Sequence, residues 1–548
     1  MKITFLKSFF NWYDNKTSIF KFLFCGILFS LFLATFLNIP FYKYVVNQQA
    51  NTQLLISFFL ILFFNYFLIF TLFSIRFIGR VLIFIVLLIS LGVWYYMQYL
   101  GGCISYEVIV ATMETSRREA LEFLPVSVII MLLVFAIVVG FVVHKLKFHF
   151  EKFYIAMIVR LISILFCLVC SLILIWANYS KLALFVRHNS DTICYINIDN
   201  YIGNTFRYLK DKIGDTKIVR EEIDANPVIK RENNRKKFIV LLVGETSRAM
   251  NYSLNGYERD TNPYLKKYLQ DGSLVNFENA TSCGTATGWS VPCMFDYRTR
   301  KQFNKKKYYE NVLSLTGKAG VSQIWYENDD GAKMQQQRCE YVAVQTRKHP
   351  LCSNNECKDE ILIEDLDNEI KKFSGNNDRL MIMHMIGSHG SLYYLRYTDK
   401  FAKFKPECKK NNTHECSKEE LYNAYDNTIL YQDWVISQMI EKLQKMKQNK
   451  KNENVDITLW FMSDHGESLG EHGFYLHAFP YSIAPKEQTH IPFFIWTTDD
   501  KLRKTLQEKA KLNKEGKFDV SHDNLFYTLL GLLNVESKVK NDALDLTK

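Results

Sequence analysis

Five long apolar segments in the first third of the chain constrain its fold more than any other feature. They are Phe22–Phe41, Leu54–Ile75, Val81–Leu100, Leu124–Val143 and Tyr154–Ala177. A helix needs about 20 apolar residues to cross a bilayer, because the hydrocarbon offers its backbone no other hydrogen-bond partners. A cleaved signal peptide explains the first segment poorly, since no small-residue cleavage site follows it and four more segments do. The sequence therefore predicts a membrane domain of five transmembrane helices.

Lysines and arginines beside these segments predict which way the chain crosses the membrane. The loops on one side contain Lys2, Lys7, Lys16, Lys21, Arg76, Arg80, Lys145, Lys147 and Lys152. The loops on the other side contain fewer basic residues, and glutamates offset some of them. Short cytoplasmic loops carry an excess of lysine and arginine, so the N-terminus is expected in the cytoplasm. An odd number of spans then exports the C-terminal half.

The chain of 548 residues is too long for one core, and its hydropathy changes at about Asn178. Beyond that point charged, turn-rich and short apolar stretches alternate, as in a soluble protein. We predict a membrane domain over residues 1–178, interfacial linker helices over 179–237 and a soluble catalytic domain over 238–548. The linker mixes aromatic and basic residues, which fits either a segment on the bilayer surface or an ordinary helix packed on the soluble domain.

Eight of the twelve cysteines follow the last span, where an oxidising compartment would allow disulfides. The close pairs are Cys283 with Cys293, Cys352 with Cys357, and Cys408 with Cys416. A metal cluster is the alternative, but no Cys-x2-Cys pair or pair of close histidines accompanies them, so we predict disulfides. Cys103, Cys194 and Cys339 have no obvious partner in the sequence.

The formal net charge of +11 is spread widely, which favours a lysine-rich solvated surface. Anionic lipid head groups are candidate partners of such a surface. Nucleic acid is not expected as a partner of an exported domain.

Short apolar runs alternate with amphipathic stretches in the soluble part, which predicts an α/β domain with a mostly parallel central sheet. The strand candidates are Phe238–Val243, Ser322–Tyr326, Leu380–Met385, Ile457–Met462 and Ile491–Thr497. The first four run into Gly244-Glu245, Glu327-Asn328-Asp329, Gly387-Ser388-His389 and Ser463-Asp464-His465-Gly466-Glu467. Ligands of open parallel sheets bind outside the carboxyl ends of the strands, so we predict that these groups form one site.

The stretch FMSDHGESLGEHGFYLH is the densest in groups that bind metals. Asp464 and His465 follow one buried strand directly, and Glu245 follows another. Three such ligands with an open fourth position are the arrangement of a catalytic zinc. A helix cap beside a surface histidine would explain Asp464 and His465 alone, but not together with Glu245 and Glu467. These residues therefore predict a metal site.

The stretch SCGTATGWSVPC places two threonines between two cysteines. A threonine hydroxyl held by the predicted metal would become a nucleophile. If the residues after the second threonine begin a helix, its first turn would direct backbone N–H groups towards an incoming phosphate. Simple stapling of a loop by Cys283 and Cys293, with no catalytic threonine, is the alternative.

These motifs resemble those of the phosphoethanolamine transferases of Gram-negative inner membranes. The matching stretches are Phe238–Glu245 with GETSRAMNYSLNGYERDTNPYL, then SCGTATGWSVPCMF, GSHG and SDHGESLGEHGFYLH. The resemblance covers essentially the whole chain. It implies five transmembrane helices and a periplasmic domain of the alkaline phosphatase and sulfatase type. It also implies a zinc enzyme that takes phosphoethanolamine from phosphatidylethanolamine onto a threonine and passes it to lipid A or a related envelope acceptor.

The resemblance assigns the centre of the site position by position. Glu245, Asp464 and His465 match the family's zinc ligands. Thr287 matches the nucleophile and fourth ligand, which leaves Thr285 a structural role.

The remaining roles concern the substrate. His389 and His477 match histidines that the family uses near the transferred phosphate or a second metal. The other candidates for substrate binding are Asn328, Lys333, Glu467, Thr115 and Glu119. The expected partners are the lipid donor, the envelope acceptor and the bilayer, and the chain is expected to act as a monomer.

Two other functions fit parts of the pattern. A phosphoglycerol transferase or sulfatase-like hydrolase would use the same metal, threonine and Asp-His pair, but the cysteines around Thr287 favour the transferase. A non-catalytic envelope protein would not need Glu245, Thr287, Asp464 and His465 together.

Overall fold

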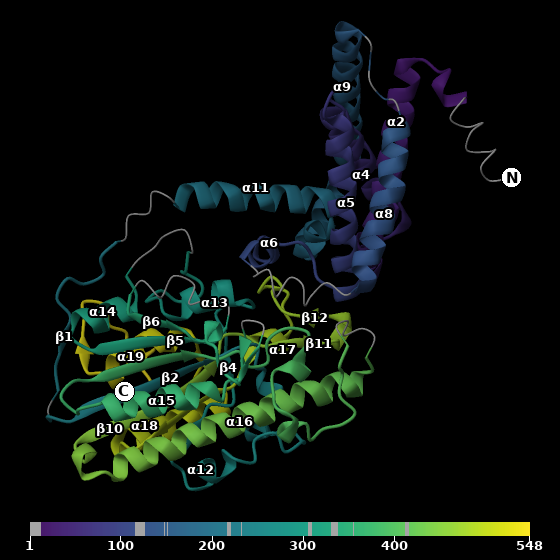
Figure 1. Cartoon of the computed structure of the whole chain (residues 1–548). Coiled ribbons are helices and arrows are strands. Elements are labelled where there is room, and N and C mark those ends of the chain that lie inside the picture. The colour runs from purple at the N-terminus through teal and green to yellow at the C-terminus, as the bar shows by residue number, and fades with distance from the viewer. Residues whose placement is uncertain are drawn as a thin grey trace. The chain divides into compact units, whose positions relative to one another are not determined.

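The computed structural model divides the chain into two compact units, the first made of Met1–Ile109 and Leu124–Arg207 and the second of Val110–Phe123 and Tyr208–Lys548 (Figure 1). It describes residues 12–114, 126–146, 148, 150, 152–215, 221–231, 233–304, 310–329, 338–353, 356–410 and 416–548. The longer part of the second unit includes residues 208–237, which the sequence assigns to the linker. The polar stretch before that boundary includes β1 (Val228–Ile229), which pairs with β16 (Val535–Glu536).

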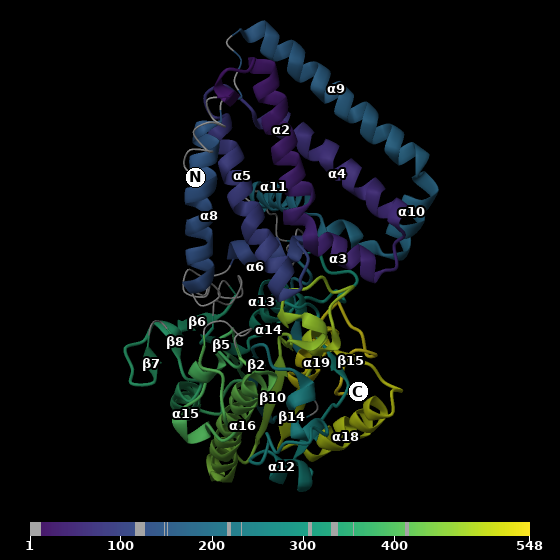
Figure 2. The same cartoon turned by 90° about the vertical axis from the view of Figure 1, so that its right-hand side faces the viewer.

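The first unit contains five helices long and apolar enough to cross a membrane, within the described residues (Figure 2). They run over Ser18–Asn47, Thr52–Phe73, Gly79–Leu100, Val126–Lys145 and Phe153–Ala177. In element labels these are α2 (Ser18–Ala34) with η1 (Phe36–Asn38) and α3 (Ile39–Asn47), α4 (Thr52–Phe73), α5 (Gly79–Tyr95) with η2 (Tyr96–Leu100), α8 (Val126–Lys145) and α9 (Phe153–Ala177). Helix α4 packs against α2 and α9, and α5 packs against α8. The five predicted spans are confirmed.

Short helices follow the last span. They are α10 (Tyr179–His188), η3 (Ser190–Tyr195) and α11 (Asn197–Asp215). Another helix outside the five spans, α6 (Tyr106–Glu114), lies between the third and the fourth span. The buried Asn197 anchors α11, because its Nδ2 donates to Leu37 O at 2.9 Å and to Ser90 O at 3.0 Å. Further along α11, Phe206 and Leu209 are 71% and 51% exposed. Both alternatives for this linker, a segment on the bilayer surface and an ordinary helix packed on the soluble domain, stay predictions.

The second unit is built on a seven-stranded sheet. Its order is β3 (Leu274–Asn276), β14 (Phe493–Thr497), β10 (Val455–Ser463), β2 (Lys236–Gly244), β9 (Arg379–His384), β5 (Ser322–Glu327) and β6 (Glu340–Ala343). The strands from β10 to β6 are parallel, whereas β14 is antiparallel to both of its neighbours. The mostly parallel sheet is confirmed. The fifth predicted strand is the antiparallel β14, so its carboxyl end lies at the edge away from the site.

Helices cover both faces of this sheet (Figure 1). Alternate side chains of β2 face α15 (Ile361–Lys372) and α16 (Lys418–Gln448) on one side. The others face α13 (Thr287–Met294), α14 (Val312–Lys318), α18 (Asp500–Lys514) and α19 (Asp523–Leu532). Burying each large aliphatic side chain contributes about 1.5–3 kcal/mol, so this doubly covered strand is a rigid support for the residues that follow it.

Smaller elements surround the sheet. They are β4 (Ala280–Thr281), β7 (Cys352–Ser353), β8 (Glu356–Cys357), β11 (Ser468–Leu469), β12 (Tyr475–Leu476), β13 (His490–Ile491), β15 (Val520–Ser521), α12 (Lys266–Gln270) and α17 (Lys486–Thr489). Disulfides join Cys283 to Cys293, Cys352 to Cys357 and Cys408 to Cys416. A fourth joins Cys103 to Cys194. Ninety-one positions separate these two cysteines, so nothing in the sequence indicates their pairing.

Candidate active site

Two neighbouring parallel strands deliver the first three site residues. Glu245 follows β2 and Asp464 follows β10, whose last residue pairs with Gly244. The Asp464 N–H donates to Gly244 O at 2.9 Å, and the Thr246 N–H donates to Asp464 Oδ1 at 3.2 Å. Glu245, Asp464 and His465 are all fully buried. The register of the sheet therefore brings these three side chains together.

Thr287 supplies a hydroxyl to the same point from the first turn of α13. Its Oγ donates to Glu245 Oε2 at 3.1 Å and lies 3.4 Å from His465 Nε2. The imidazole Nε2 is in turn 3.4 Å from Glu245 Oε1 and 3.3 Å from Asp464 Oδ2. Thr287 is only half-buried, so its hydroxyl lies where the buried cluster meets the surface.

The electrostatics of this cluster favour a bound cation. Burial raises the pKa of Glu245 well above its usual range, and the charges of Asp464 and Asp329 raise it further. Burial lowers the pKa of His465, and its Nδ1–H donates to Gly466 O at 2.9 Å, so the Nε2 lone pair faces the carboxylates. Glu245 Oε1 and Asp464 Oδ2 have no hydrogen-bond partner within the described residues. These are the features of a metal site.

A fourth buried group at the site is His384, the last residue of β9, which sequence reasoning missed. Its Nδ1 lies 2.9 Å from Glu327 Oε1 and its Nε2 lies 3.7 Å from Glu245 Oε2. Burial acts to lower the pKa of His384, but Glu327 and Glu245 outweigh it and raise the pKa. Among the residues that the structure describes, possible ligand atoms lie within 4.8 Å of one another in two groups, Glu245 with His384 and Asp464, and Glu327 with Asp329 and His384. The only signal in the sequence is a histidine at the end of a buried strand.

His477 and His389 lie beside this cluster. The ring centroids of His477 and His465 are 4.6 Å apart, and those of His477 and His389 are 6.4 Å apart. The carboxylate of Glu467 orients His477 through Nδ1 at 2.9 Å. Leu476 and Ala478, on either side of His477, have φ angles of 65° and 70°. Such left-handed backbone is strained for these residue types and is typical of functional loops.

Two buried side chains fix the loop that leads to Thr287. The Thr285 hydroxyl donates to Phe479 O, and Thr285 O accepts from Ala478 N. His522 Nδ1 accepts from Cys283 N at 3.0 Å, while its Nε2–H donates to Ser463 O at 2.9 Å. Burial lowers the pKa of His522 to about 4, consistent with a neutral ring. The sequence does not indicate His522, which lies far along the chain from both loops.

Of the other predicted substrate contacts, the structure describes Asn328 but not Lys333, Thr115 or Glu119. Asn328 is fully buried, and its Nδ2 donates to Cys357 O and Asp359 Oδ1.

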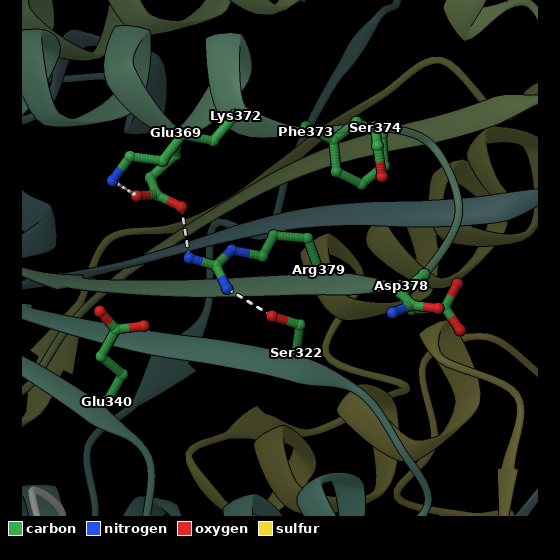
Figure 3. A pocket seen from close by; sticks show the side chains of 9 residues that line it. Ser322, Glu340, Glu369, Lys372, Phe373, Ser374, Asp378 and Arg379 are labelled. Carbon is green, nitrogen blue, oxygen red and sulfur yellow. Dashed lines mark hydrogen bonds and ion pairs between the residues drawn. The ribbon is translucent and has the colours of Figure 1, made fainter.

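A hollow of about 360 Å³ lies at the opposite, amino-terminal edge of the sheet (Figure 3). It is lined by Ser322 and Arg379, the first residues of β5 and β9. Arg379 bonds to Glu369 and to Ser322, and Glu369 also pairs with Lys372 at 3.0 Å. The Arg379, Glu369 and Lys372 charges in this hollow therefore pair with one another.

Known proteins share both units of this chain. The family Phosphoethanolamine transferase EptA/EptB matches residues 62–213, and the family Sulfatase matches residues 237–535. Phosphoethanolamine transferase EptA of Salmonella typhimurium is 34% identical over 95% of each chain. Phosphatidylethanolamine transferase Mcr-2 of Escherichia coli is 30% identical over 97% of this chain and 98% of its own. The solved integral membrane lipooligosaccharide phosphoethanolamine transferase A of Neisseria meningitidis has a TM-score of 0.87 and 32% identity, covering 97% and 98% of the two chains.

Proposed function

The chain belongs to the phosphoethanolamine transferase family of these EptA and Mcr relatives, and from that premise we propose that it transfers phosphoethanolamine from phosphatidylethanolamine to lipid A through Thr287. It is a multi-pass membrane protein whose catalytic domain lies in the periplasm. The names of two relatives, phosphatidylethanolamine transferase Mcr-2 and lipooligosaccharide phosphoethanolamine transferase A, support a phosphatidylethanolamine donor and a lipooligosaccharide-type acceptor.

One observation supports the proposal most strongly. The Thr287 Oγ lies 3.1 Å from Glu245 Oε2 and 3.4 Å from His465 Nε2, at the half-buried edge of the cluster. A hydroxyl held by a carboxylate and an imidazole is an arrangement that prepares a nucleophile.

Glu245, Asp464, His465 and Thr287 would hold a zinc ion. Two carboxylates, an imidazole nitrogen that faces inward and a hydroxyl suit zinc, and two carboxylate oxygens lack other partners within the described residues. Zinc held there supplies Lewis-acid activation of the hydroxyl and balances the charge of the phosphate.

Thr287 changes its bonds in two displacements. In the first, its Oγ attacks the donor phosphorus, so that an Oγ–P bond forms and the bond from phosphorus to the diacylglycerol oxygen breaks. The Thr287 proton passes to Glu245 Oε2, the atom to which the hydroxyl donates. In the second, an oxygen of lipid A attacks the same phosphorus and the bond from phosphorus to Thr287 Oγ breaks. Oγ regains the proton that Glu245 holds, and the proton of the lipid A oxygen passes to His477. A covalent intermediate divides one difficult transfer into two easier steps.

His477 and His389 act on the phosphate and the leaving group. Glu467 fixes the ring of His477 through its Nδ1, and this oriented imidazole gives a proton to the departing diacylglycerol oxygen. His389, on the neighbouring strand end, contacts the phosphate oxygens. Asn328, Lys333, Thr115 and Glu119 are proposed as further substrate contacts on the family resemblance.

The mass spectrum of lipid A tests this function directly. Cells that express the chain should gain one phosphoethanolamine unit on lipid A, and cells that express the Thr287→Ala variant at the same level should not. Unchanged lipid A in both strains would contradict the proposal.

A further inference from the structure

Asp359 is a buried carboxylate just before α15 that no sequence motif includes. It is 2% exposed. Its Oδ1 accepts hydrogen bonds from Asn328 Nδ2 and Ile386 N, both at 2.9 Å, and its Oδ2 accepts from Gly387 N at 3.0 Å. Burial raises the pKa of Asp359 to about 6, while these three bonds oppose the rise. Burying a carboxylate is costly, and here its donors all come from segments that follow β5 and β9 at the active edge of the sheet.

The backbone that Asp359 holds also touches a proposed metal ligand. Gly387 has a φ of +52°, and a Cβ added there would lie 2.6 Å from Glu245 O. The next residue, Ser388, donates its N–H to Glu245 O at 3.0 Å, and His389 follows. A shift of this segment would therefore displace His389 and disturb the backbone of Glu245.

Asp359 also decides which atom Asn328 presents. The Asn328 Nδ2 donates to Asp359 Oδ1 and to Cys357 O, each at 2.9 Å. This fixes the amide orientation and leaves Oδ1, which has no hydrogen-bond partner in the described part of the chain. An acceptor oxygen suits an N–H donor such as the ammonium group of ethanolamine.

We propose that Asp359 is a positioning residue for phosphoethanolamine transfer, because its carboxylate fixes both the Asn328 amide and the Ile386–Gly387 backbone. It acts through these groups and does not touch the substrate. Its consequence for transfer rests on the proposed function, whereas its hold on the segment can be measured without any substrate.

The Asp359→Asn variant keeps the size of the side chain but replaces one acceptor oxygen with an NH2 group. At least one N–H donor then faces another donor. We expect kcat/KM for phosphatidylethanolamine to fall by about 10- to 100-fold, as small displacements of groups around a reacting centre do. Zinc content should fall much less than in Asp464→Ala, since Asp359 contacts none of the proposed ligand atoms.

Asp365→Asn is the matched control. Asp365 is also a buried aspartate in this region, on α15, but its partner is Arg347 at 2.8 Å. This variant should lose stability without losing kcat/KM in the folded protein. A double-mutant cycle of Asp359→Asn with Asn328→Ala adds a second criterion. If Asp359 acts partly through Asn328, the double variant should lose less than the two single losses multiplied together.

Amide hydrogen exchange of the full-length protein in phospholipid nanodiscs measures the positioning itself. The peptide that contains Ile386 and Gly387 should exchange faster in Asp359→Asn and at the wild-type rate in Asp365→Asn. Asp359→Ser, which removes the carboxylate without placing an NH2 group against the amides, gives the same readout should the asparagine variant not fold.

The exchange and transfer measurements test the positioning role of Asp359 and the proposed function separately. Unchanged exchange in the Asp359 variants overturns the positioning role. Faster exchange with wild-type kcat/KM overturns its role in transfer. A wild-type protein that transfers no phosphoethanolamine refutes the proposed function, while the exchange measurement still decides whether Asp359 holds the segment.

Discussion

Two fully buried carboxylates meet at the candidate site, and an imidazole that faces them offers them no proton. Glu245 and Asp464 repel each other, and their burial makes that repulsion costly, as the raised pKa of Glu245 reflects. A divalent cation between them removes this cost. The same cation would lie beside Thr287 Oγ, where a hydroxyl needs help to lose its proton.

Loss of one ligand should therefore remove the metal. Asp464→Ala should lower zinc affinity by more than about 100-fold, since loss of even an outer partner of a zinc ligand costs about 10- to 100-fold. Zinc bound per protein after dialysis, measured by atomic emission, provides the check. Asp456→Ala is the control, because Asp456 lies on the same strand β10 but pairs with Arg235 and Lys237 at the opposite edge. Full zinc content in Asp464→Ala would mean that the ligands are wrongly assigned.

Single site residues could be predicted where they directly follow a strand that is recognisable in the sequence. Asp464, His465 and Glu245 directly follow strands that the apolar runs reveal, so their convergence follows from the parallel sheet. Asp359 and His522 could not be found in this way. Their partners lie between 27 and 239 positions away, and only the folded chain brings them together.

At the level of elements, the site depends on strand ends and loops that are tied to one another. The disulfide between Cys283 and Cys293 joins the loop before α13 to that helix. His522, at the start of α19, bonds to the backbone of this loop and to the end of β10. These ties hold the Thr287 loop against the residues that follow β10.

Stability should depend on pH through His522. Its pKa is about 4 in the folded protein, below the ordinary value of 6.5, so the unfolded chain binds more protons between these pH values. The stability it contributes is complete above pH 6.5 and is lost as the pH falls towards 4, by up to roughly 3 kcal/mol. Thermal unfolding at pH 7 and pH 4.5 checks this. His522→Asn should unfold at a lower temperature at pH 7 and lose less on acidification. An equal loss in both proteins would contradict the assignment.

Long helices and strands could be predicted from the sequence, whereas short strands could not. The long apolar strands β2, β5, β9 and β10 are evident in the sequence, as are all five spans. Strands β3 and β6, of three and four residues, leave too short a pattern to recognise. The direction of β14 could not be predicted either, because an apolar run contains no information on strand polarity.

The whole molecule combines a membrane unit with an exported catalytic unit. The basic loops and the disulfides after the last span agree on this topology. A reporter that is active only in the periplasm should work when fused after Lys548, and one that is active only in the cytoplasm should work when fused after Lys145. The reverse activities would contradict the orientation and the basis of the disulfides.

The proposed mechanism predicts a covalent adduct on Thr287, which peptide mapping by mass spectrometry of the purified full-length protein would detect. When phosphatidylethanolamine is supplied without an acceptor, the peptide that contains Thr287 should gain one phosphoethanolamine group. The Thr287→Ala variant should show neither adduct nor transfer, and Thr287→Ser should keep some adduct because a hydroxyl remains. Thr285→Ala should keep the adduct, since that hydroxyl bonds to Phe479 O. An adduct on Thr285, or normal transfer by Thr287→Ala, would mean that Thr287 is not the nucleophile.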